Sequence, residues 1–151
     1  MPENNINLKK LGCYLGVDYG DVRTGLAKTD LSRFLAGGIG YIKPGGMRNT
    51  AVAVAQEAKK AEAIRIIVGL PKNMDGSEGE RAKTVRIFVD ILATLTDIPI
   101  DFCDERLTTV EAYNFLNITD TASRKRRSVI DTLSAQIMLQ DYIDRENSQK
   151  K

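Results

Sequence analysis

The sequence predicts an α/β domain with a mixed β-sheet, and two observations lead to this fold class. Residues 11–43 hold three short strand-like runs, joined by segments too short for a crossover helix, as in an antiparallel hairpin region. Beyond them, two further apolar runs alternate with segments of helical periodicity, the pattern of parallel βαβ crossovers. Because 151 residues fit one domain, we expect a single domain over 1–151 with its core at about 11–146.

Local patterns predict the elements in order. Apolar residues alternate over 11–17, and the glycine-bearing turn after Asp18 makes 24–29 the hairpin partner of this first strand. Asn49 is expected to cap the alanine-rich helix that follows. The continuous β-branched run at 64–69 is typical of a central strand covered on both faces. The expected strands are 11–17, 24–29, 38–43, 64–69 and 98–104, and the expected helices are 50–63, 80–95, 108–116 and 128–145, with a polar loop at 117–127.

Composition excludes several classes of protein. The chain has no histidine, which rules out Ser-His-Asp and Cys-His catalysis as well as histidine-ligated zinc. Cys13 and Cys103 are far apart in the sequence and are expected to be buried, reduced thiols. No apolar run approaches the roughly 18 residues that span a bilayer, and the N-terminus lacks the pattern of a signal peptide. We therefore expect a cytoplasmic protein with no membrane partner.

Carboxylates follow apolar segments at three places in the chain. Asp18 ends the first strand, Asp104 and Glu105 end the last one, and Asp131 precedes Ala135 on an apolar stripe of the final helix. Each acid alone also fits a structural role: a turn, a salt-bridged strand end, or a first-turn aspartate favoured by the helix dipole. If all three converge at the carboxyl ends of the strands, they predict a site for Mg²⁺ or Mn²⁺ that acts on phosphodiesters.

Basic residues near these acids suit a nucleic-acid substrate. Arg23 follows Asp18 closely, and a guanidinium there is able to hold a phosphate bidentately, although a structural ion pair is an alternative. The loop at 69–79 lacks a Walker motif, and its small and amide residues fit either substrate contact or an ordinary surface loop. The densest run precedes the final helix and either holds a phosphate backbone or forms a solvated loop: Arg124, Lys125, Arg126 and Arg127.

The combination of these motifs resembles the bacterial YqgF family, also called RuvX-like. The resemblance extends in order from about Leu15 to Tyr142. Its motifs are Val17-Asp18-Tyr19-Gly20 with Arg23 and Gly25, Val68-Gly69-Leu70-Pro71 with residues 73–79, Asp104-Glu105-Arg106-Leu107-Thr108-Thr109, and Ile130-Asp131 with Ala135 and Leu139.

The resemblance implies a ribonuclease H-like fold with a five-stranded mixed sheet of order 3-2-1-4-5 flanked by helices. It implies a hydrolase, specifically a nuclease that processes the 5′ end of pre-16S ribosomal RNA in ribosome biogenesis. The catalytic and metal-binding positions would be Asp18, Glu105 and Asp131. Arg23 and the loop from Asn73 through Gly76 to residue 79 would lie near the substrate.

Several alternatives stay open. Many related resolvases place a carboxylate at the end of the central strand, whereas this strand ends in Gly69-Leu70-Pro71. The second metal ligand is therefore Glu105, Asp104, or one of the loop acids Asp75 and Glu78. An older label for the family predicts a Holliday junction resolvase acting on branched DNA, and a third hypothesis is a non-catalytic RNA-binding assembly factor. The sequence is compatible with a monomer or a homodimer.

Overall fold

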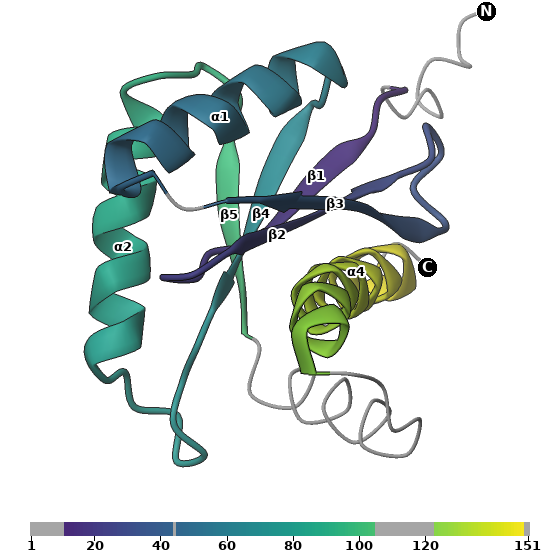
Figure 1. Cartoon of the computed structure of the whole chain (residues 1–151). Helices are drawn as coiled ribbons and strands as arrows, with labels where there is room; N and C mark the ends of the chain where they lie inside the picture. Colours follow the sequence, from purple (N-terminus) through teal and green to yellow (C-terminus); the bar gives the residue numbers. More distant parts are fainter. Residues whose placement is uncertain (1–10, 44, 105–122, 150–151) are drawn as a thin grey trace, which may run out of the picture.

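The computed structural model of the chain describes residues 11–43, 45–104 and 123–149, with the side chains of 123–131 outside the description. Five strands form one sheet of order β3-β2-β1-β4-β5, which confirms the predicted order (Figure 1). The strands are β1 (Tyr14–Asp18), β2 (Thr24–Thr29), β3 (Ala36–Ile42), β4 (Arg65–Leu70) and β5 (Ile100–Asp104).

The sheet is mixed because its first half is a hairpin region and its second half is built by crossovers. β1 pairs antiparallel with β2, and β2 pairs antiparallel with β3 across a bulge between Leu26 and Ala27. β1 pairs parallel with β4, which pairs parallel with β5. The β-branched residues of β4 are fully buried, as expected for a strand covered on both faces: Ile66, Ile67 and Val68.

Helices cover both faces of the sheet (Figure 1). α1 (Met47–Lys60) and α2 (Glu80–Ala93) pack on one face, where Val85, Phe88 and Leu92 of α2 are buried as their helical spacing predicts. α4 (Ser123–Gln149) packs on the opposite face. Within the part of the chain that the structure describes, no helix has the length and apolarity needed to cross a bilayer.

α4 also covers the outer edge of β3. The Gln136 side chain accepts a hydrogen bond from the Gly38 N–H at 3.2 Å, and the Gln140 side chain accepts one from the Ala36 N–H at 2.8 Å. Side-chain amides thus take the place of a further strand along this edge. Such cover protects an edge strand from pairing with other chains.

Two local predictions were wrong. Residues 123–127 were expected in a loop, but α4 begins at Ser123, and the high helix propensity of Arg and Lys explains why this polar segment continues the helix. Asn49 was expected to cap α1, but the helix begins at Met47 after Gly46, and the Asn49 side chain instead donates to the Gly45 carbonyl at 2.6 Å. The expected helix at 108–116 lies outside the described residues.

Both cysteines are buried free thiols, as predicted. Cys13 lies just before β1, and burial raises the pKa of its thiol. Cys103 lies in β5 and packs against α4, where its thiol donates to the Met138 carbonyl with a sulfur–oxygen distance of 3.7 Å. For Cys13, the raised pKa disfavours a reactive thiolate.

Candidate active site

Asp18 ends β1, which lies between β2 and β4 in the sheet, and Asp18 is partly buried. The next residue anchors the strand end, because the Tyr19 ring stacks on Phe88 of α2 with centroids 4.4 Å apart. Arg81 of the same helix donates to the Tyr19 carbonyl at 3.3 Å. Packing and hydrogen bonding therefore fix the backbone at the position where Asp18 leaves the sheet.

The turn after Asp18 requires glycine. A Cβ on Gly20 would collide with the carbonyl oxygen of Arg23, so no other residue fits without a shift of the backbone. The Gly20 N–H donates to the Thr24 hydroxyl at 3.4 Å. The chain then returns as β2, whose Gly25 pairs directly with Asp18.

Asp18 belongs to the face of the sheet that α4 covers. Alternate residues of β1 share a face, and Tyr14 belongs to the hydrophobic cluster on the α4 side. Gly16, between them, is so close to Leu139 of α4 that an added Cβ would lie 3.0 Å from the Leu139 Cβ. By the same alternation, the Asp18 side chain is on the face that α4 approaches.

The backbone of α4 brings position 131 to the same end of the sheet. The hydroxyl of Thr132 donates to the Gly40 carbonyl of β3 at 3.3 Å. Gly40 pairs with Leu26 of β2, and Leu26 pairs with Val17 of β1. Asp131 precedes Thr132 by one residue, so its backbone lies near the level at which β1 ends in Asp18. The side chain of Asp131 is outside the description.

The stripe that predicted Asp131 as a site residue faces the sheet where side chains are described. Ala135 and Met138 are fully buried in the cluster beneath α4, and Tyr142 packs against it. This part of the helix agrees with the predicted inward face.

Residues of β5 alternate between the two faces of the sheet, and the strand ends at Asp104. Cys103 packs on the α4 side, whereas Phe102 packs into the cluster on the α1 and α2 side. Alternation along β5 assigns Asp104 to the face of Phe102, which is opposite the face of Asp18. Glu105 itself lies outside the described residues.

The loop that contains Asn73 and Gly76 is closed by its own hydrogen bonds. The Asn73 N–H donates to the Ser77 carbonyl at 2.8 Å, and the Gly76 N–H donates to the Asn73 carbonyl at 2.8 Å. Gly76 has φ +90°, a conformation that favours glycine. The Ser77 hydroxyl donates to Asp75 at 2.6 Å, so this candidate ligand serves the loop structure.

Glu78 ties the same loop to the rest of the molecule. Its two oxygens accept hydrogen bonds from Arg86 of α2, both at 2.8 Å, which lowers the pKa of the Glu78 carboxyl. The Arg86 guanidinium lies over the Phe102 ring of β5 at 4.9 Å. Since both oxygens are engaged by Arg86, Glu78 is poorly placed to be the second metal ligand.

The donor chemistry fits a hard divalent cation. All the predicted ligands are carboxylates, and the sequence contains no histidine. Among the described side chains, no group of three histidine, cysteine, aspartate or glutamate residues is close enough to hold a metal. Of the predicted ligands Asp18, Glu105 and Asp131, the structure describes the side chain of Asp18, and its position at a strand end suits this role.

The predicted basic residues lie near the same end of the sheet. Arg23 lies in the turn between β1 and β2, with its guanidinium carbon 5.4 Å from the centroid of the Tyr41 ring. Residues 124–127 lie at the start of α4. This part of the helix precedes Thr132, which contacts β3 near the carboxyl end of β1. Sequence analysis missed Tyr41 and Arg81, because neither belongs to a charge run or a recognisable motif.

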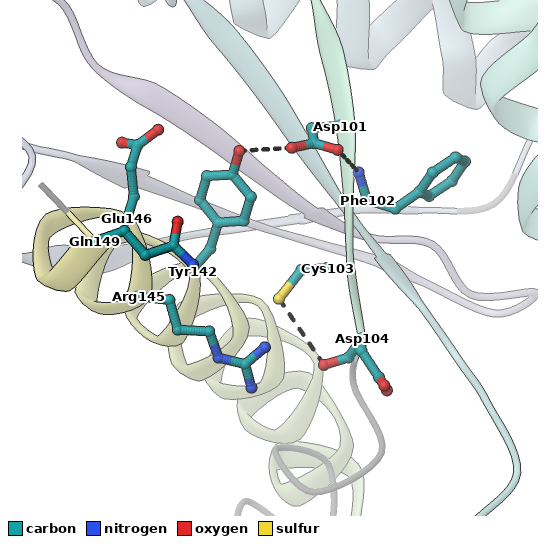
Figure 2. A pocket seen from close by; sticks show the side chains of 8 residues that line it. All are labelled: Asp101, Phe102, Cys103, Asp104, Tyr142, Arg145, Glu146 and Gln149. Atoms are coloured by element: carbon teal, nitrogen blue, oxygen red, sulfur yellow. Dashed lines mark hydrogen bonds between the residues drawn. The ribbon is translucent and has the colours of Figure 1, made fainter. Parts of the chain in front are cut away.

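A groove of about 270 Å³ lies between β5 and the C-terminal half of α4 (Figure 2). Tyr142 donates to Asp101 at 2.6 Å, and Asp101 also accepts from the Phe102 N–H at the outer edge of β5. Burial first, and then the bond to Asp101, raise the pKa of Tyr142. The groove is lined by Asp101, Phe102, Cys103, Asp104, Tyr142, Arg145, Glu146 and Gln149.

This groove is unsuited to a phosphate backbone. It carries three carboxylates and a single arginine, and that Arg145 forms an ion pair with Asp141 at 2.8 Å. Glu146 accepts from Tyr14 at 2.7 Å and from Arg65 at 2.8 Å, linking α4 to β1 and β4. The polar groups here hold the helix on the sheet, and sequence analysis did not anticipate them.

Comparisons with known proteins agree with the motifs. The family model described as "RuvX: Holliday junction resolvase" matches residues 12–145. A Halothermothrix orenii protein named "Putative pre-16S rRNA nuclease" is 41% identical over 133 residues, covering 88% of this chain and 95% of that protein. A protein of the same name from Thermoanaerobacter pseudethanolicus is 41% identical over 135 residues, covering 89% of this chain and 97% of that protein.

Solved structures agree on the fold. The crystal structure of the fowlpox virus Holliday junction resolvase has a TM-score of 0.54 and 12% identity to this chain, covering 89% of it and 99% of the viral chain. At that identity the likeness concerns the fold alone, and it confirms the ribonuclease H-like arrangement. Since the family model and these relatives match most of its length, the chain belongs to the RuvX family.

Proposed function

We propose that this protein is a metal-dependent nuclease that cuts pre-16S ribosomal RNA at its 5′ end. The observation that supports the proposal is that Asp18 and the backbone of position 131 lie at the same end of the sheet, on the face that α4 covers. Family membership and the names of the relatives support a nuclease acting on this RNA. We propose that it works in the cytoplasm as a single domain over residues 1–151, with its core at about 11–146.

The residues proposed to hold the metal are Asp18, Glu105 and Asp131. Alternation along β5 assigns Asp104 to the face opposite Asp18, which disfavours it. The hydrogen bond of Asp75 to Ser77 and the ion pair of Glu78 with Arg86 of α2 disfavour those two acids, and Glu105 is therefore the preferred second ligand. Bound Mg²⁺ or Mn²⁺ would activate water and stabilise the leaving oxygen of a phosphodiester. The three carboxylates supply the oxygen ligands that such ions prefer.

The basic residues are proposed to hold the RNA. Arg23 lies in the turn that follows Asp18, and its guanidinium is positioned over Tyr41. It would hold the phosphate next to the metal. Arg124, Lys125, Arg126 and Arg127 at the start of α4 would attract the flanking phosphates. Asn73 and Gly76 would contact the substrate through a loop already shaped by its own hydrogen bonds.

The test is incubation of the purified chain with 5′-extended 16S precursor RNA and, separately, with a four-way DNA junction, each with Mn²⁺ or with EDTA. We expect cleavage of the RNA only when Mn²⁺ is present. Cleavage of the junction alone would make the protein a resolvase of branched DNA. RNA binding without cleavage under any metal condition would make it a non-catalytic assembly factor.

A further inference from the structure

Three paired residues form a strip across the sheet at the proposed active site. Asp18 of β1 pairs with Gly25 of β2, and Gly25 pairs with Tyr41 of β3. Directly paired residues point to the same face of a sheet, so Tyr41 shares the face of Asp18. Two strand spacings of about 4.8 Å separate them, and Gly25 contributes no side chain between them.

Tyr41 is the most exposed of the described tyrosines, although Tyr142 is also partly exposed. Tyr14 and Tyr19 are buried, with 3% and 8% of their surfaces exposed, whereas Tyr41 is 37% exposed on an edge strand. Its ring also lies beneath the guanidinium of Arg23 at 5.4 Å. An exposed aromatic ring paired with an arginine is therefore held about 10 Å from the proposed metal ligand.

We infer that Tyr41, together with Arg23, is a stacking platform for one unpaired base of the RNA next to the cleavage position. This inference rests on the proposed function. Unpaired RNA bases stack on aromatic rings and on guanidinium planes, while bases inside a duplex are already stacked. A base held at Tyr41 would fix the register of the strand, so that the neighbouring phosphate reaches Asp18 across the strip.

The chain contains no tryptophan, so Tyr41→Trp creates a single fluorescent reporter at the platform. Phe34→Trp is the matched control, because Phe34 is exposed before the start of β3, at the opposite end of that strand. EDTA prevents metal-dependent cleavage while binding is measured. We expect a single-stranded RNA from the 5′ precursor segment to quench the tryptophan fluorescence of the Tyr41→Trp protein and to leave that of the Phe34→Trp protein unchanged.

Fluorescence anisotropy of labelled RNA measures binding independently of the tryptophan. If the Tyr41→Trp protein binds RNA by anisotropy without quenching, the platform is wrong while the nuclease proposal stands. Equal quenching by a fully paired RNA duplex would also overturn it, because no unpaired base is then available. If the wild-type protein binds no precursor RNA at all, both proposals fail.

Affinity supplies a second readout. Tyr41→Ala is expected to weaken binding of the single strand about tenfold, on the order of the loss of one base–aromatic stack, while Tyr41→Phe retains the wild-type affinity. The expected change in cleavage is a rise in KM together with a fall in kcat, because the cut phosphate is no longer held in register with Asp18. Wild-type affinity of the folded Tyr41→Ala protein would contradict the inference.

Discussion

The charged side chains at the two ends of the sheet have different surroundings. At the amino ends of β1 and β4, Glu146 accepts hydrogen bonds from Tyr14 and Arg65, so an acid from the last helix meets donors from two strands. At the carboxyl end, Asp18 leaves the sheet beside a glycine turn, and the backbone of Asp131 approaches the same level. Opposite charges join the elements at the amino end, whereas the acids that we propose as metal ligands belong to the carboxyl end.

This difference indicates a division of work within one small domain. A partly buried ion pair that is also hydrogen-bonded holds the helix on the sheet. Loss of one partner leaves the other without its hydrogen bond and ion pair, which lowers stability. A group of like charges does the reverse, because it lowers stability unless a cation lies among them. The amino end should therefore determine stability, and the carboxyl end should determine activity.

The largest expected effect is that of Asp18→Asn at the carboxyl end. Loss of this charge is expected to reduce cleavage about 1,000-fold or more, since the amide is a poor ligand for a hard cation. Stability should be unchanged or higher, because repulsion among the acids falls. Cleavage assays and urea unfolding check the two halves of the prediction, with the exposed Asp97→Asn as control. Wild-type cleavage by Asp18→Asn would remove this residue from the site.

The next effect concerns the basic run at the start of α4. Arg126→Ala with Arg127→Ala is expected to weaken RNA binding and to reduce the slope of log affinity against log salt by roughly 1.5 if both contact phosphates. Lys59→Ala with Lys60→Ala removes two exposed charges from the last turn of α1 and should leave the slope unchanged. Equal slopes for the two double variants would identify the run as a solvated helix surface.

At the amino end, Glu146→Gln is expected to lower the free energy of unfolding by about 2 kcal/mol and to leave cleavage unchanged. The change weakens the bonds with Tyr14 and Arg65, whose partners are partly or fully buried. Glu80→Gln is the matched control, because its pair with Lys83 is exposed and should contribute less than about 0.5 kcal/mol. Urea unfolding measures both. Equal stabilities would show that the amino end does not hold the helix.

The smallest effect is a loss of stability at high pH. Burial first, and then the hydrogen bond to Glu146, raise the pKa of Tyr14 to about 12, above its ordinary value of about 10. Because the folded state favours the protonated phenol, this contribution is complete below pH 10 and is lost as the pH rises toward 12. Unfolding measured across this range should show a smaller decline for Tyr14→Phe than for wild type. Identical declines would contradict the assignment to Tyr14.

Sequence predicted the elements whose pattern is local. The β-branched run of β4 indicated a central strand, and the alternation of β1 placed Asp18 at a strand end, because periodicity and burial coincide there. The network of Glu146 was not predictable, since its partner Tyr14 lies 132 positions away. Tyr41 was missed because it belongs to no charge run or motif, and only the pairing of β3 with β2 shows that it shares the face of Asp18.

The start of α4 shows where composition misleads. Charged residues before an apolar stripe look like a solvated loop, yet arginine and lysine favour helix, and the structure continues the helix to Ser123. The basic run is therefore part of α4, the helix that also carries Asp131.

The most direct test of the account is Mn²⁺ binding measured by electron paramagnetic resonance on the full chain without RNA. The account predicts that wild type binds the ion, and that Asp18→Asn, Glu105→Gln and Asp131→Asn each weaken binding at least about tenfold, while Asp97→Asn leaves it unchanged. Wild-type Mn²⁺ affinity in the folded variants at 18 and 131 would show that these acids do not share an ion, and the proposed site would be wrong.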